Sequence, residues 1–192
     1  EQDRLTPETL PPDLADACLV LTAGTTSAGV IDPLEFAGRA AWTHVDAAWA
    51  GPLRLSDQHA AVLQGIENAD SISVSAHKWF FQPKESALIF FRNTAEADPA
   101  ISFGGAYLAV PNIGLRGSHG AVAVPLLATL LAWGRTGLAE LIDRAMAVAQ
   151  LLHERLSAHP KIEVFGPATT GVVLWKLATP EATTEVFERL PK

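Results

Sequence analysis

The apolar positions in the first half of the chain fall into short runs that are separated by polar, turn-forming segments. Strands are predicted over residues 18–24, 42–51, 71–79 and 86–92, and helical segments over 31–40 and 57–70. Because strands and helical segments alternate, we expect an α/β fold. Its central sheet should be mostly parallel and covered on both faces.

The second half of the chain predicts long helices and the start of a smaller unit. Its elements are helices over 121–137 and 138–159, a strand pair over 161–166 and 171–178, and a last helix over 181–190. Pro125 falls in the first turn of a helix, where proline is tolerated, and Gly134 and Gly137 mark a break. We therefore expect a large α/β part in residues 1–136. Residues 137–192 should form a helix and the beginning of a small α+β C-terminal domain.

Composition and charge exclude some classes of function. The 192 residues include 14 basic and 21 acidic side chains, the net charge is −7, and lysine and arginine do not cluster. Nucleic acid is therefore not an expected partner. The sequence contains no recognisable signal peptide or membrane span, and Cys18 stands in an apolar run typical of a buried thiol in a reducing compartment. We expect a cytoplasmic protein that does not bind a membrane.

An aspartate and a lysine stand at the ends of two predicted strands. Alone, Asp46 could cap the next turn and Lys78 could be a solvated strand-end residue. Together they match the needs of pyridoxal phosphate (PLP), which requires a lysine amine for a Schiff base and a carboxylate to keep its pyridine nitrogen protonated. Both would face one cofactor, since ligands of open α/β sheets bind at the carboxyl ends of the strands. Trp79, Phe80 and Phe81 should form an apolar wall beside the amine.

Four motifs in a fixed order carry a resemblance to a known family. They are TAGTTSAGVIDP, WTHVDAAWAG, ENADSISVSAHKW and the Gln-Pro-Lys that follows. In this order they closely resemble the group II PLP-dependent decarboxylases, which include aromatic amino acid, glutamate, histidine and diaminobutyrate decarboxylases. The match runs from about Leu21 to Arg92 and continues more loosely to the C-terminus. It implies a fold type I PLP-dependent transferase (aspartate-aminotransferase-like), with residues 1–136 as the C-terminal part of the PLP-binding large domain, including an active-site loop.

The resemblance implies catalytic roles for Lys78, Asp46 and His77, and a cofactor-binding role for Ser75. Lys78 matches the Schiff-base lysine and Asp46 the partner of the pyridinium nitrogen. His77 and Ser75 match positions beside the cofactor phosphate and the substrate carboxylate. An ordinary hydrogen bond at the end of a strand is the alternative role for His77 and Ser75.

Two further residues match cofactor-binding positions of the family. Ala48 matches a small residue packed against the ring, and Thr26 matches a threonine near the cofactor and substrate. Core packing and turn formation are the alternative explanations. His44 could be a hydrogen-bond partner of Asp46 or a core histidine. Because His44 and Asp46 lack further ligands at metal spacing, we expect no metal site.

The sequence departs from the family pattern upstream of the matched motifs. The resemblance implies a histidine stacked on the pyridine ring and a loop that cradles the phosphate, and neither is found in these 192 residues. We therefore expect the chain to be a piece of a larger active unit, as a separate subunit, a proteolytic product or an incomplete polypeptide. The expected assembly is a homodimer, or a hetero-oligomer with a chain that supplies the N-terminal part.

A second departure lies in the glycine-rich stretch Asn93–His119, which we expect to be less regular and, like many loops of this length, to carry function. It corresponds to a catalytic loop whose tyrosine, in several relatives, returns a proton to the substrate after carbon dioxide leaves. The stretch is shorter here. Tyr107 is either this proton donor or a structural residue, and His119 is an alternative acid.

The leading hypothesis for function is PLP-dependent decarboxylation of an L-amino acid to its amine. The nearest alternative is another fold type I reaction at Lys78 and Asp46, such as amine oxidation or carbon–carbon bond cleavage. A third hypothesis is a non-catalytic subunit of a split enzyme, which keeps the motifs without completing a site.

Overall fold

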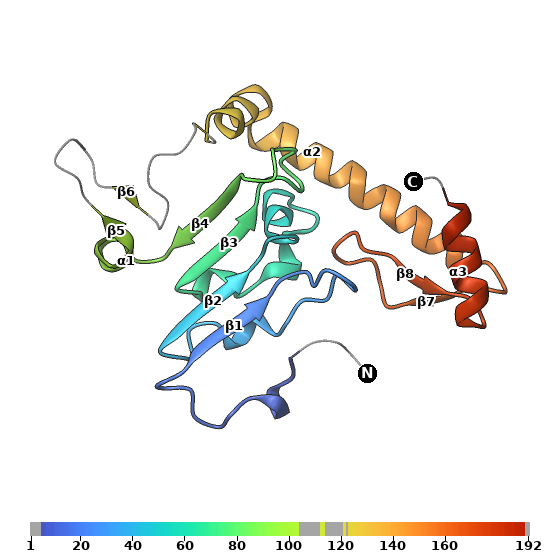
Figure 1. Ribbon diagram of the computed structural model, residues 1–192, viewed down its shortest axis with the longest axis horizontal. Helices are drawn as coiled ribbons and strands as arrows, with labels where there is room; N and C mark the ends of the chain where they lie inside the picture. The colour runs from blue at the N-terminus through green and yellow to red at the C-terminus, as the bar shows by residue number, and fades with distance from the viewer. Residues whose placement is uncertain (1–4, 104–111, 114–120, 122, 191–192) are drawn as a thin grey trace.

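A four-stranded sheet forms the centre of the computed structural model, which describes residues 5–103, 112–113, 121 and 123–190. Its strands, in spatial order, are β1 (Cys18–Thr22), β2 (Trp42–Asp46), β3 (Ser71–Ser75) and β4 (Ala87–Phe91). β1, β2 and β3 are parallel, and β4 is antiparallel to β3. The predicted α/β fold with a mostly parallel sheet is confirmed. The carboxyl ends of the three parallel strands point toward the long helix α2 (Figure 1).

The segments between the strands are short 3₁₀ turns, so the helices predicted over 31–40 and 57–70 are wrong. The turns between the strands are η2 (Leu34–Phe36), η3 (Gly51–Leu55), η4 (Ala60–Leu63) and η5 (Ile66–Asn68), and one more turn, η1 (Pro7–Thr9), precedes β1. Gly65 explains the interruption between η4 and η5. Its φ of 97° is left-handed, and a Cβ there would lie 2.9 Å from the carbonyl oxygen of Leu34. Only glycine allows η5 to approach η2 this closely.

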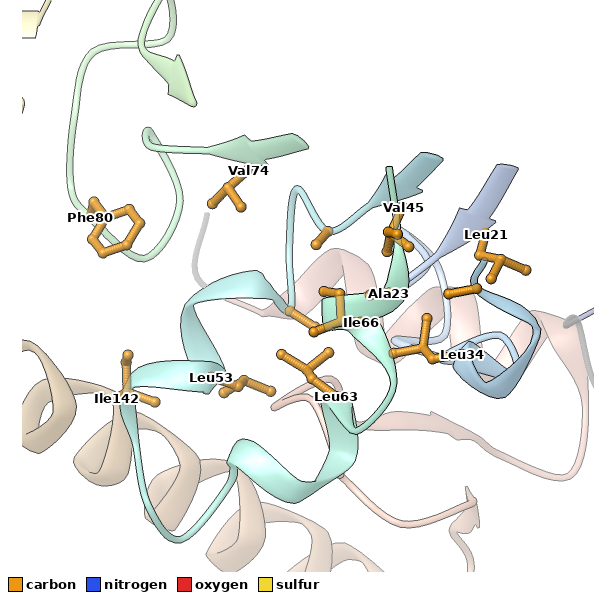
Figure 2. Close-up of a cluster of buried hydrophobic side chains, with 14 of the residues drawn as sticks. Leu21, Ala23, Leu34, Val45, Leu53, Leu63, Ile66, Val74, Phe80 and Ile142 are labelled. Atoms are coloured by element: carbon orange, nitrogen blue, oxygen red, sulfur yellow. The ribbon is translucent and has the colours of Figure 1, made fainter. Parts of the chain in front are cut away.

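One face of the sheet packs on these turns and forms the hydrophobic core. Figure 2 shows Leu21, Val45 and Val74 of the parallel strands above side chains from the turns, among them Leu53 and Leu63. Burying one such side chain fully contributes about 1.5–3 kcal/mol. This single core therefore holds the sheet to the turns.

The other face of the sheet is open in the part of the chain that the structure describes. On this face Val20 is 55% and Ile89 is 51% exposed. The expected cover on both faces is therefore not present among these residues. The expected burial of Cys18 is also wrong, because the two-residue period of β1 puts its thiol on the same open face as Val20.

The stretch predicted as an irregular loop begins with regular structure. Helix α1 (Thr94–Ile101) leads into β5 (Ser102–Phe103), which pairs antiparallel with β6 (Asn112–Ile113). The predicted less regular stretch therefore starts with a regular helix and a short strand. Tyr107 and His119, the two candidate proton donors, lie outside the described residues.

Helix α2 (Ala123–Ser157) joins the sheet to a small C-terminal unit (Figure 1). The predicted break in this region is a kink at Gly134, where φ is 58° and ψ is −172°. Beyond the kink, Leu138, Ile142 and Met146 are buried against the core. Within the described residues no helix has the length and apolarity needed to cross a membrane.

The C-terminal unit has the predicted elements. It contains β7 (Glu163–Phe165), β8 (Leu174–Lys176) and α3 (Pro180–Arg189). The two strands pair antiparallel, and the Thr179 side chain caps the helix by accepting the Ala182 N–H. The strand pair and the last helix are therefore confirmed.

Asp70 connects three strands at the amino end of β3. Its carboxylate accepts the backbone N–H of Thr43 at 2.7 Å and forms an ion pair with Arg92. Burial raises the pKa of this carboxyl, but the Thr43 N–H and the Arg92 guanidinium outweigh burial and hold the pKa below its usual value. The carboxylate form thus supports the register of β2, β3 and β4.

Replacing Asp70 by asparagine should reduce stability at neutral pH and flatten its acid dependence. A group with a depressed folded-state pKa stabilises the protein above its unfolded pKa of about 3.9, and this contribution is lost as the pH falls through the lower folded value. Because Arg92 is about half exposed, we expect a loss of about 1 kcal/mol at pH 7. Urea unfolding at neutral and acid pH measures it, with the exposed Asp57→Asn as control. An unchanged acid dependence in Asp70→Asn contradicts the assignment.

Candidate functional site

Asp46 ends the central strand β2, in register with Thr22 of β1 and Ser73 of β3. Its side chain is exposed on the open face of the sheet. Oδ1 accepts the backbone N–H of Ala48 at 3.0 Å and the Ser73 hydroxyl at 3.5 Å. Among the described residues, no group donates to Oδ2. One carboxylate oxygen is thus held by the protein, and the other is available to a ligand.

His44 and Ser71 extend these contacts along the open face. His44 stands two residues before Asp46, so both side chains lie on one face of β2. Its Nε2 is 3.2 Å from Ser73 Oγ, and its Nδ1 is 2.8 Å from Ser71 Oγ. The predicted partnership of His44 and Asp46 is therefore indirect and runs through Ser73. Neither serine of this network was singled out from the sequence.

Lys78 lies in a tight turn that follows β3. Its backbone N–H donates to Ser75 O at 3.4 Å, and its carbonyl accepts the Phe81 N–H at 3.2 Å. The Gln82 N–H closes the turn on Ala76 O at 3.2 Å. Phe81 has a φ of 56°, which is rare for a bulky residue and persists only where the surrounding structure enforces it. The local backbone is therefore under strain beside the candidate lysine.

The Lys78 side chain lies against two tryptophans. Its Nζ is 5.9 Å from the centroid of the Trp49 ring, and Trp49 meets Trp79 edge to face at 5.3 Å. With Phe81, these residues line a pocket of about 330 Å³ that α2 and Gly171 close on the other side. The Trp79 Nε1 is buried and has no hydrogen-bond partner among the described residues. The pocket therefore places the Lys78 amine in largely apolar surroundings.

The predicted aromatic wall is only partly correct. Trp79 and Phe81 line the pocket with Lys78. Phe80 is 7% exposed and belongs to the core on the other side of the turn. The strained conformation of Phe81 reverses the chain after Phe80, so consecutive aromatic side chains do not share one surface.

The other predicted site residues lie near the carboxyl ends of the strands. Thr26 is exposed in the turn that follows β1, Ser75 is half-buried at the end of β3, and His77 is exposed beside Lys78. Their side chains make no hydrogen bond within the part of the chain that the structure describes. Ala48 is half-buried and contacts Asp46 through its backbone N–H.

The residues present fit PLP by their chemistry. The cofactor carries its aldehyde and its pyridine nitrogen at opposite positions of one ring, so their protein partners must lie apart. Lys78 and Asp46 follow neighbouring parallel strands, and no ion pair joins them among the described residues. The described side chains include no cluster of three or more histidine, cysteine, aspartate or glutamate residues that could hold a metal ion.

The backbone and the C-terminal segment fix Trp49 beneath Lys78. Its Nε1 donates to Thr170 O at 2.7 Å, and the Thr170 hydroxyl donates to Gly29 O at 2.7 Å. Gly24 has a φ of 94°, and a Cβ there would lie 2.9 Å from Trp49 Cδ1. The turn after β1 therefore depends on glycine to admit the indole ring.

Gly24→Ala should displace Trp49 and destabilise the fold more than Gly134→Ala. Both glycines have a positive φ, but a Cβ at Gly134 would meet nothing within 4 Å. Both variants bear backbone strain, and only Gly24→Ala adds overpacking, which costs about 1–3 kcal/mol. Urea unfolding measures the difference, and tryptophan fluorescence reports the ring. Equal losses in the two variants contradict the role of the Trp49 contact.

Comparison with known proteins identifies the family. Residues 14–178 match the family model of the pyridoxal-dependent decarboxylase conserved domain. An L-2,4-diaminobutyrate decarboxylase from Rhizobium meliloti (strain 1021) is 34% identical over 173 residues, and an aromatic-L-amino-acid decarboxylase from Bacillus atrophaeus is 28% identical over 196 residues. These alignments cover 82% and 91% of this chain but only 35% and 41% of the relatives.

A solved structure agrees with this match. The crystal structure of Oryza sativa TDC with PLP and tryptamine has a TM-score of 0.74 and 25% identity, over 90% of this chain and 41% of that one. The predicted fold type I architecture and the resemblance to group II PLP-dependent decarboxylases are thereby confirmed. The cofactor of such enzymes is pyridoxal phosphate. The chain belongs to the pyridoxal-dependent decarboxylase family.

Proposed function

We propose that the protein containing this chain is a PLP-dependent carboxy-lyase that converts an L-amino acid to its amine. The observation that carries the proposal is the position of Asp46, which ends β2, and Lys78, which follows the neighbouring parallel strand β3, at one edge of the sheet. Membership of the family and the match to a PLP-containing structure support the cofactor. The similarity to relatives named as amino acid decarboxylases supports an amino acid as the substrate.

Asp46 would keep the pyridine nitrogen protonated. Its Oδ1 is occupied by the Ala48 N–H and the Ser73 hydroxyl, so Oδ2 would be the oxygen that accepts the pyridinium N–H. A carboxylate at this position favours the charged form of the ring nitrogen. When bound, the cofactor supplies an electron sink for the pair left on the α-carbon as carbon dioxide departs.

Lys78 would hold the cofactor covalently and release it to the substrate. Its amine would be the group that binds the cofactor between turnovers and gives up its place to the substrate amine. Trp49 and Trp79 shield the amine from water on one side. The turn after β3 keeps this side chain at the edge of the sheet.

Four further residues complete the proposed site. His77 would take part in catalysis and lie beside the cofactor phosphate and the substrate carboxylate. Ser75 would lie in the same part of the site and help to bind the cofactor. Ala48 would pack against the ring, and Thr26 would approach the cofactor and substrate. The position of all four near the carboxyl ends of β1, β2 and β3 supports these roles.

We also propose that further polypeptide completes the active unit, as a homodimer or as a hetero-oligomer. Val20 and Ile89 are apolar side chains left exposed on the open face of the sheet, and parallel sheets are normally covered on both faces. Val124, Leu127 and Leu131 form an exposed stripe on α2, with exposures of 59%, 55% and 78%. Exposed apolar areas of this kind are typical of contact surfaces.

The division into a large domain within 1–136 and a second part within 137–192 remains a prediction. The kink at Gly134 and the separate β7–β8 pair support it. The cytoplasmic location also remains a prediction, which the single cysteine supports.

Borohydride reduction of the assembled protein with PLP should fix the cofactor onto Lys78. Mass spectrometry would locate the adduct at Lys78 and not at Lys84, an exposed lysine of the same β3–β4 connection. Lys78→Ala should abolish both the adduct and turnover, whereas Lys84→Ala should change neither. Asp46→Asn should lower kcat by about 10²–10³-fold, the size expected for losing a preorganised electrostatic partner.

Product analysis separates the proposed reaction from its alternatives. Carbon dioxide and amine in equal amounts, without ammonia, indicate decarboxylation. Release of ammonia indicates amine oxidation, and cleavage at a side-chain bond indicates a lyase of another kind. If the assembled protein forms no adduct and Lys78→Ala leaves its activity unchanged, the chain is a non-catalytic subunit and the proposal is wrong.

A further inference from the structure

Four side chains on the open face of the sheet form a continuous line that ends at Asp46. The Trp42 indole N–H donates to Ser71 Oγ at 3.0 Å, and Ser71 Oγ is 2.8 Å from His44 Nδ1. The opposite ring nitrogen, Nε2, is 3.2 Å from Ser73 Oγ, and the Ser73 hydroxyl reaches Asp46 Oδ1 at 3.5 Å. Trp42, His44 and Asp46 alternate along β2, and the two serines alternate along β3. Strand register alone therefore assembles the line.

The two ends of the line favour one direction. An indole N–H can only donate a hydrogen bond, and an ionised carboxylate can only accept one. Each hydroxyl between them has a single proton, which it can donate toward Asp46 while it accepts from the other side. In this direction Ser71 donates to His44, and Ser73 donates to Asp46.

This direction selects one form of the histidine ring. Nδ1 must be unprotonated to accept the Ser71 hydroxyl, and Nε2 must carry a proton to donate to Ser73 Oγ. The neutral Nε2–H tautomer of His44 satisfies both contacts. The Nδ1–H tautomer reverses the middle of the line and leaves Asp46 without the Ser73 proton.

We propose that Trp42, Ser71, His44 and Ser73 form a one-way hydrogen-bonded relay that positions the Asp46 carboxylate. The inference rests on the proposed function of Asp46 as the pyridinium partner. The relay and the Ala48 N–H both act on Oδ1. They fix the rotation of the carboxylate and leave Oδ2 for the pyridinium N–H. His44 is thus a positioning residue that acts through Ser73.

The last contact of the relay is the adjustable one. At 3.5 Å, the bond from Ser73 to Asp46 is at the long limit of hydrogen bonding, whereas the other contacts are 2.8–3.2 Å. Hydrogen bonds at catalytic groups often tighten only when the ligand is bound. A pyridinium on Oδ2 should draw the carboxylate into place and shorten this contact, and bonds in a chain strengthen one another.

The protonation of His44 can be measured directly in the assembled protein. Nitrogen-15 NMR with labelled histidine distinguishes a protonated from an unprotonated ring nitrogen, with and without PLP. The expected result is a neutral His44 with its proton on Nε2. Ser71→Ala removes the donor to Nδ1, and Trp42→Phe removes the N–H that orients the Ser71 hydroxyl, so each should raise the population of the Nδ1–H tautomer.

The effect on Asp46 is measured with Ser73→Ala. This variant should bind PLP about tenfold more weakly, the effect expected for one hydrogen bond to a charged group. It should also shift the nitrogen-15 signal of the pyridine ring in bound, labelled PLP. Ser73→Thr, which keeps a hydroxyl on a strand residue, should restore both. Thr22→Val removes a hydroxyl from the same face beside Asp46, outside the relay, and should leave the His44 signals and PLP affinity unchanged.

Two results overturn the relay. One is a His44 that carries its proton on Nδ1 or on both nitrogens in the unmodified protein. The other is a Ser73→Ala variant whose PLP affinity and pyridine signal match those of Thr22→Val. Failure of the proposed function is recognised separately, because the unmodified protein then forms no Lys78 adduct while the His44 tautomer still reports on the relay.

Discussion

The alternation of side chains along β2 governs both the core and the site. Thr43 and Val45 are completely buried on the inner face, so His44 and Asp46 must stand on the outer one. A slip of one residue would bury the Asp46 carboxylate among leucines, which is unfavourable by several kcal/mol for an uncompensated charge. Asp70 opposes such a slip from the other end of the sheet, since it binds the Thr43 N–H and Arg92 together. The same register that protects the core therefore presents the carboxylate to a ligand.

The strands were predictable from the sequence and the connections were not. A buried strand needs only a short apolar run, and all four runs form strands. The helices predicted between them are 3₁₀ turns, because the conformation of these segments depends on contacts with residues distant in the chain, which the local spacing of apolar residues does not reveal. Gly65 adopts a left-handed conformation because its backbone approaches Leu34, more than thirty residues away in the chain. The prediction that Cys18 is buried was wrong for a similar reason. Cys18 lies in an apolar run, but only the assembled sheet shows which of its faces remains open.

The sequence alone was enough to propose the candidate site at the level of residue types. Asp46 and Lys78 stand out because a carboxylate and an amine at adjacent strand ends suit one cofactor. The residues that position them are non-local and carry no motif. Ser71 and Ser73 matter only because β3 pairs with β2 in the register that sets them beside His44. Trp49 is likewise held by Thr170, which is 121 residues away in the chain. Spacing in the sequence predicts such contacts only when the strand register is already known.

The open face determines how strongly Asp46 can act on a bound ring. Two unit charges 4 Å apart interact by about 1 kcal/mol in water and by about 4 kcal/mol at the lower effective dielectric near a covered protein site. An exposed Asp46 would therefore hold a pyridinium proton weakly. Val20 and Ile89 provide apolar surface on the same face, so a segment that covers them also removes water from the carboxylate and from the relay behind it. Under the proposed function, burial of this face by further polypeptide and protonation of the cofactor would be coupled, because one covering segment would provide both.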